Sequence, residues 1–121
     1  MKNRSVLFAF IILVIGSSCK KTIGEGATVT EQRSTGNFTG IELSIPATVN
    51  FSQAPNFKVE ISAQQNILNI IQTYVVGNTL IIKVKDKKKL GRHDAITATI
   101  TAPSLNALRV AGSGNINQLV L

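Results

Sequence analysis

The chain has 121 residues, a length that suits one domain, and its 13 lysines and arginines exceed its six acids to give a formal net charge of +7 at pH 7. A single cysteine excludes an internal disulfide bond. With no tryptophan and one tyrosine, the chain is poorly supplied for a platform of aromatic rings that stack on sugars.

Residues 1–18 have the pattern of an export signal. Lys2 and Arg4 supply a basic start, residues 6–15 are an unbroken apolar run, and small residues follow from Gly16. Ten helical residues rise about 15 Å, roughly half of a hydrocarbon core, so we do not expect a stable transmembrane span. Loss of Lys2 and Arg4 with the signal lowers the net charge from +7 to about +5.

Cys19 follows this signal directly. Small residues before a single cysteine resemble the lipobox of bacterial lipoproteins, which implies that Cys19 carries fatty acids such as palmitate and becomes the mature N-terminus. Two or more acyl chains hold a protein stably on a membrane. The alternative is an ordinary secretory signal cut after Ser18, which would leave a free thiol. We expect a lipid-anchored protein of the cell envelope, at the outer membrane.

Residues 19–26 are polar and are predicted to be a tether, which leaves residues 27–121 as the folded domain. Alternating patterns in the first half of this domain predict short strands at residues 28–34, 38–45, 47–53 and 57–62. The apolar side chains expected to face the core are Ile41, Leu43, Ile45, Ala47, Val49, Phe51, Phe57, Val59 and Ile61.

One short helix is predicted near residues 63–70. Ser62 and Gln65 have the spacing of a capping box, in which each side chain satisfies a backbone donor of the other residue. Ile67, Leu68 and Ile71 follow at helical spacing. We expect about two turns.

Gly77-Asn78 lies between two further strand patterns, residues 72–76 and 79–85, and is typical of a tight hairpin. A charged loop at residues 86–94 comes next. Later strands are predicted at residues 95–101, 105–111 and 115–121. In the first of these, Ile96, Ala98 and Ile100 should point inward and Thr97, Thr99 and Thr101 outward. The whole pattern predicts an all-β domain of seven to nine short strands.

Several short motifs in a fixed order point to a family. They are Arg33, residues 38–41 (FTGI), Val59 and Ile61 ahead of residues 66–68 (NIL), residues 77–82 (GNTLII), residues 103–105 (PSL) and residues 110–116 (VAGSGNI). Together they resemble the head GIN domain of the autotransporter adhesin family, found in envelope lipoproteins of Bacteroidetes-type bacteria. The resemblance covers residues 27–121.

This resemblance implies a β-solenoid similar to the pectate-lyase-like β-helix, a role in adhesion and no catalytic residues. Family domains usually continue through many more strands after the turn at residues 112–114, so the resemblance also implies a truncated domain. Because the Gly77-Asn78 hairpin predicts antiparallel pairing, parallel strands are expected only after it.

No constellation for catalysis is recognised in the sequence. Glu42 and Glu60 face solvent by strand parity, where nothing would adapt a carboxyl group to general-acid catalysis. His93 lies beside Asp94, but no second histidine is available for a metal site. Gly112-Ser113-Gly114 lacks the lysine and helix of a phosphate loop. We therefore expect no enzyme activity, no cofactor and no metal.

The most distinctive surface feature is a cluster of six cations within ten residues, and they are Lys83, Lys85, Lys87, Lys88, Lys89 and Arg92. An export signal makes nucleic acid an improbable partner, so the candidates are anionic envelope glycans or the headgroups of the protein's own membrane. The alternative is that lysines near an edge strand prevent aggregation and keep the protein soluble.

Three functions remain open on this basis. The first is a non-catalytic, lipid-anchored head that binds glycans or another protein at the cell surface. The second is a structural envelope solenoid that self-associates at an open C-terminal end. The third is a glycan-cleaving enzyme built on a β-helix. It would need a pair of carboxylates or a calcium-bound Arg/Lys site on one face, and strand parity predicts neither.

Overall fold

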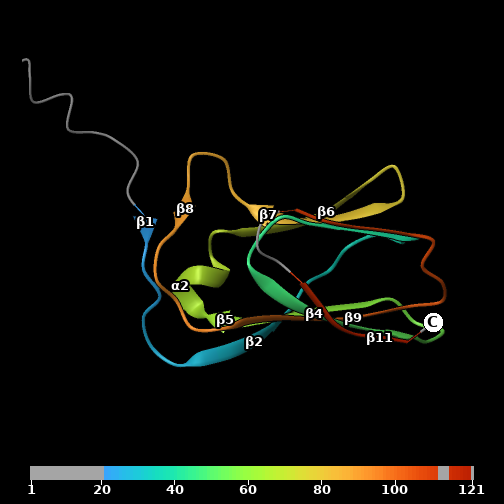
Figure 1. The fold of residues 1–121 in the computed structure, drawn as a ribbon, viewed down its shortest axis with the longest axis horizontal. Coiled ribbons are helices and arrows are strands. Elements are labelled where there is room, and N and C mark those ends of the chain that lie inside the picture. Colours follow the sequence, from blue (N-terminus) through green and yellow to red (C-terminus); the bar gives the residue numbers. More distant parts are fainter. Residues whose placement is uncertain (1–20, 112–114, 121) are drawn as a thin grey trace, which may run out of the picture.

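The computed structural model describes residues 21–111 and 115–120, which form eleven strands and one short helix (Figure 1). The four-stranded sheet has the order β10 (Ala107–Val110), β3 (Gly40–Leu43), β7 (Thr79–Val84) and β6 (Ile71–Val76). The five-stranded sheet has the order β11 (Asn115–Val120), β4 (Ala47–Gln53), β9 (Ile96–Ala102), β5 (Lys58–Gln64) and β2 (Thr28–Gln32). A third sheet pairs β1 (Lys21–Thr22) with β8 (Lys89–Leu90), and the helix is α2 (Gln65–Leu68).

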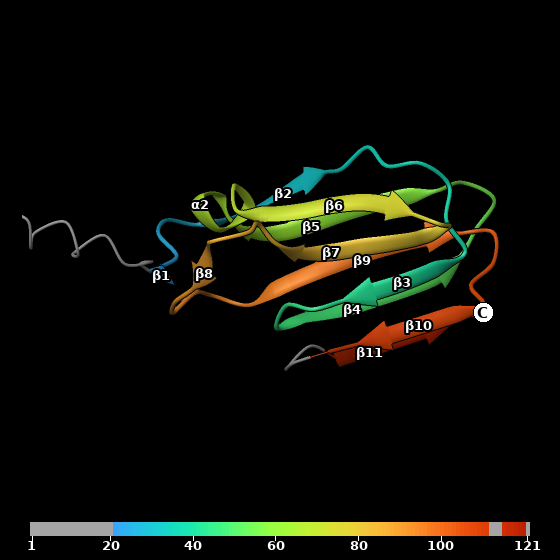
Figure 2. The ribbon, with the colours of Figure 1, turned by 90° about the horizontal axis from the view of Figure 1, so that it is seen from above.

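The core lies between the two larger sheets, which face each other (Figure 1 and Figure 2). The predicted inward positions of the strands are confirmed except for Phe57, which is only half-buried and packs against the core. The other predicted side chains are at most 4% exposed. These side chains are Ile41, Leu43, Ile45, Ala47, Val49, Phe51, Val59, Ile61, Ile96, Ala98 and Ile100. Each large apolar side chain buried in this way stabilises the fold by about 1.5–3 kcal/mol.

The pairing of the strands corrects the predicted β-solenoid. In a β-helix, every strand pairs in parallel with its neighbour. Here β3 is parallel to β7 and β4 to β9, but β6 is antiparallel to β7 and β5 is antiparallel to β9. The described residues therefore form two larger sheets of mixed pairing beside the small sheet of β1 and β8, and the solenoid prediction is wrong. Parallel pairing also involves β1, β3 and β4, which all precede the hairpin, so it is not confined to the strands after it.

The hairpin between β6 and β7 was predicted correctly, and it explains why these two strands of the four-stranded sheet are antiparallel. Gly77 and Asn78 have φ angles of +55° and +68°, as a tight turn of this kind requires at both central positions. The turn reverses the chain, so β6 and β7 must be antiparallel. The remaining strands of this sheet, β3 and β10, join by parallel pairing with β7 and with each other.

The helix is shorter than predicted, because β5 continues through Gln64. Ser62 is a strand residue, and its Oγ lies 2.7 Å from Oγ1 of Thr30 on β2. It is therefore unavailable as a cap, and the N-cap residue is Gln64, which makes no capping hydrogen bond with its side chain. The capping-box prediction is wrong, whereas the burial of Ile67 and Leu68 confirms the predicted apolar face.

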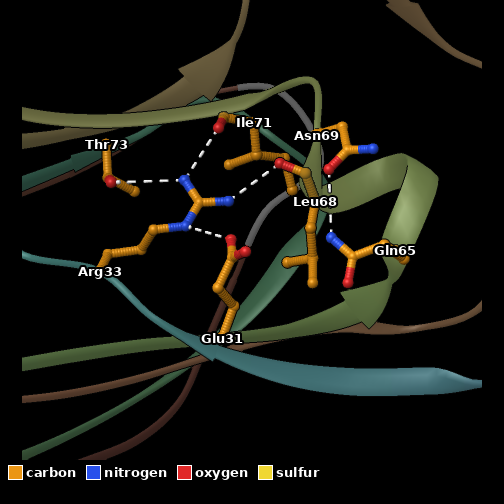
Figure 3. Close-up of polar contacts among 7 residues, drawn as sticks. All are labelled: Glu31, Arg33, Gln65, Leu68, Asn69, Ile71 and Thr73. Carbon is orange, nitrogen blue, oxygen red and sulfur yellow. Dashed lines mark hydrogen bonds and ion pairs between the residues drawn. The ribbon is translucent and has the colours of Figure 1, made fainter.

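Arg33 follows β2 of the five-stranded sheet, and its side chain forms hydrogen bonds to α2 and to β6 of the four-stranded sheet (Figure 3). Its Nη1 and Nη2 groups donate to the carbonyl oxygens of Ile71 and Leu68, both at 2.9 Å. Its Nε group donates to Glu31 Oε1 at 2.7 Å. A guanidinium presents several donors in a rigid fork, so one side chain satisfies carbonyls on both α2 and β6. These bonds hold α2 against the end of the two sheets.

Candidate functional site

Most of the predicted cations gather at one end of the molecule, beside β1 and β8 (Figure 1). We call this end the basic pole, and it is defined by Lys21, Lys85, Lys87, Lys88, Lys89 and Arg92, all of which are exposed. Lys83 differs from the other predicted cations. It is a half-buried residue of β7, and its Nζ lies 3.3 Å from Asp86 Oδ1, so this ion pair is already formed.

Lys21 was missed in the sequence because it lay in the predicted tether. The parallel pairing of β1 with β8 places Lys21 opposite Lys89, 68 positions later in the chain. No local pattern indicates such a distant two-residue pairing. Residues 21–26 thus lie against the domain, although the sequence assigns them to the tether.

Two backbone hydrogen bonds hold this segment to the loop after β8. The Gly91 N–H donates to the Thr22 carbonyl oxygen, and the Gly24 N–H donates to the Arg92 carbonyl oxygen, each at 2.7 Å. Gly91 has a clear reason to be glycine. A Cβ atom there would lie 3.1 Å from Lys21 Cβ and 3.2 Å from the Thr22 oxygen, so β1 would have to shift by a few tenths of an ångström to accept a side chain.

Two amide side chains at the helix secure the same segment. Asn66 Nδ2 donates to the Ile23 carbonyl oxygen at 2.7 Å, while Asn66 Oδ1 accepts from the Glu25 N–H at 3.0 Å. Gln64 is buried, and its Nε2 donates to the Gly26 carbonyl oxygen at 2.9 Å. Residues 22–26 are therefore hydrogen-bonded to the loop after β8 and also to the side chains of Gln64 and Asn66.

The outer side of the five-stranded sheet presents rows of polar side chains. The register places Thr48 beside Thr97, Thr97 beside Ser62, and Ser62 beside Thr30. Neighbouring strands lie about 4.8 Å apart, so these side chains form a regular array. We call it the hydroxyl face, defined by Thr30, Thr48, Asn50, Ser52, Ser62, Thr97, Thr99 and Thr101, each half-exposed or exposed.

Neither surface is hollowed. No pocket is found among the residues that the structure describes, and the same residues contain no group of three side chains that could hold a metal ion. His93 Nδ1 donates to the Asp94 carbonyl oxygen at 2.6 Å and not to its carboxylate. Within the described ranges no helix is long and apolar enough to cross a bilayer. Both surfaces are suited to broad, shallow contacts.

Two predicted features lie outside the described residues. They are Cys19 with its export signal, and the turn at residues 112–114.

Of the candidate site residues, the basic pole unites five of the six predicted cations and adds Lys21.

A family model described as "Putative auto-transporter adhesin, head GIN domain" matches residues 37–118. The chain belongs to this family. The motifs recognised in the sequence therefore identified it correctly.

Solved structures share the fold of this head GIN chain. A putative adhesin from Bacteroides fragilis is 24% identical with a TM-score of 0.72, and the match covers 78% of this chain and 44% of that one. A putative lipid binding protein from Parabacteroides distasonis is 21% identical with a TM-score of 0.72, covering 80% and 43%. A putative adhesin from the same species is 20% identical with a TM-score of 0.73, covering 82% and 42%.

The head GIN chain thus spans less than half the length of these proteins. At such identities the likeness establishes a common fold. A comparison with the curated proteins found no match.

Proposed function

We propose that this head GIN protein is a non-catalytic adhesin of the cell envelope, held to the outer membrane by acyl chains on Cys19. The family match over residues 37–118 is the observation that carries the adhesive role. The anchor rests on the sequence, in which a basic start, a short apolar run and small residues precede the single cysteine.

The hydroxyl face is the adhesive surface in this proposal. Threonine is β-branched and loses little further rotamer freedom when a partner binds, so a row of threonines can form hydrogen bonds at a low entropic cost. The charged neighbours Lys58 and Glu60 lie 3.9 Å apart and offset each other. A nearly neutral array of hydroxyls fits an uncharged, polar surface polymer such as a glycan.

The anchor is tested by feeding cells a fatty-acid analogue that can be detected after incorporation. The native protein is expected to become labelled and to remain with the membrane fraction, whereas Cys19→Ala should carry no label, because its side chain has no thiol to acylate. Equal labelling of both proteins would exclude Cys19 as the attachment site.

The adhesive surface is tested with the double variant Thr97→Val and Thr99→Val. Valine keeps the shape and strand preference of threonine but removes the hydroxyl, so the fold should persist. Two hydrogen bonds of about 1 kcal/mol each are lost, and binding to intact cells or isolated surface glycans should weaken about 30-fold. Thr79→Val on the opposite sheet is the matched control and should bind normally. Unchanged binding by the double variant would refute the assignment of this face.

A further inference from the structure

We infer that the basic pole docks onto the anionic headgroups of the membrane that holds the anchor, so that the domain stands in a fixed orientation on the bilayer. This inference builds on the proposed lipid anchor. The occupant of the pole is thus a lipid surface carrying negative charge, and the pole is the membrane-facing end of the adhesin.

The distribution of charge supports this assignment. Away from the pole, Arg33, Lys58 and Arg109 are balanced by Glu31, Glu42 and Glu60 in residues 21–111. Near the pole, the charges of Lys83 and Asp86 cancel each other. The only other acids there are Glu25 and Asp94, against the six cations of the pole. The entire excess of positive charge in the described residues is therefore concentrated at one end.

The anchor and the pole are close along the chain. Lys21 follows Cys19 by two residues, which span at most about 7 Å. That distance is below the screening length of about 8 Å at physiological ionic strength. Because Lys21 pairs with Lys89, acyl chains inserted at Cys19 would bring the loop of the pole within range of the headgroup charge.

The hydrogen bonds of residues 22–25 hold this segment against the domain. A flexible tether would let the domain turn freely, and the pole would face the bilayer only part of the time. Instead, Gly91 and Arg92 bind the segment from one side and Asn66 binds it from the other. The side chain of Ile23, within this segment, is 51% exposed. An exposed apolar group amid cations suits the boundary between headgroups and acyl chains.

A role in preventing aggregation explains the cations less well. The exposed edge strand β6 has the sequence IQTYVV, and its Val76 side chain is 59% exposed without any lysine on the strand. β1 and β8 lie at one end of the molecule (Figure 1), so the cations beside them can approach a broad charged surface together.

The test uses the processed chain, residues 19–121, with Cys19→Ala so that docking is measured without acyl chains. Vesicles of phosphatidylcholine mixed with phosphatidylglycerol should bind this protein, and vesicles of phosphatidylcholine alone should not. Each cation near an anionic surface strengthens binding about fivefold, so Lys88→Gln with Lys89→Gln should weaken it about 25-fold. The matched control Lys58→Gln with Arg109→Gln removes the same charge elsewhere and should change little. Circular dichroism and thermal melting verify that each variant is folded.

The outcomes separate docking from anchoring. Vesicle binding that ignores lipid charge, or that falls equally in the two double variants, overturns the inference. Tighter binding to polygalacturonate than to anionic vesicles would assign the pole to acidic glycans and overturns it as well. Vesicle binding without fatty-acid labelling of the native protein would leave docking intact and reject only the anchor.

Discussion

Replacing Phe38 by alanine is expected to lower the free energy of unfolding by about 4 kcal/mol. The Phe38 ring is 1% exposed and packs edge-to-face on Phe57, with ring centroids 5.1 Å apart and an interplanar angle of 66°. Phe38 precedes β3 and Phe57 precedes β5, so the pair joins the two sheets. Alanine would remove this contact and leave a cavity. A loss of this size is a large share of the 5–15 kcal/mol typical of a small domain.

Urea denaturation of the Phe38 variants provides the measurement. Phe38→Leu should cost only about 1.5 kcal/mol, because most of the volume is kept. A double-mutant cycle with Phe57→Ala should give a coupling energy of about 1 kcal/mol for the aromatic pair. Leu108→Ala is the control, since this side chain is 39% exposed and contributes little to the core. A loss for Phe38→Ala as small as that of the control would contradict the described packing.

Replacing Arg33 by alanine should destabilise the fold by about 3 kcal/mol. The Leu68 and Ile71 carbonyl oxygens each accept a charge-assisted hydrogen bond from the guanidinium at 2.9 Å, and both would lose their donor (Figure 3). The side chain of Arg33 is 15% exposed, so water can replace these bonds only in part. Arg33→Lys should recover about half of the loss, because one ammonium does not reproduce the fork.

Glu31→Gln identifies which contacts of Arg33 matter. The Glu31 side chain is 43% exposed, so its ion pair with Arg33 should contribute less than about 1 kcal/mol, and an amide oxygen can still accept the Nε hydrogen bond. Thermal and urea unfolding of the three variants give the comparison. If Glu31→Gln lowers the free energy of unfolding as much as Arg33→Ala, then Arg33 stabilises the fold through its ion pair and not through its two hydrogen bonds to carbonyl oxygens.

The candidate site was only partly visible in the sequence. The run of cations in residues 83–92 is a local feature, and the structure keeps five of them exposed together. Lys21 and Ile23 could not be found in this way, because their place depends on the pairing of two-residue strands far apart in the chain. Gln64 and Asn66 were assigned to the helix predicted near residues 63–70, yet their side chains hold the N-terminal segment.

The sequence by itself determined which side of the core strands is buried and where the hairpin turns. Alternation at residues 41–51 and 96–100 separates inward from outward side chains, and Gly77-Asn78 supplies the positive φ angles of the hairpin. These are local properties, since a pleated strand alternates its side chains whatever lies beside it.

Only the tertiary structure decided which strands are neighbours. β9 lies between β4 and β5, although those two strands are consecutive in the chain, and it is parallel to one and antiparallel to the other. Backbone hydrogen bonds are chemically the same for every pair of strands, so pairing follows from how the apolar faces fit together across the core. For that reason an alternating pattern is equally compatible with the expected solenoid and with the two mixed sheets that form.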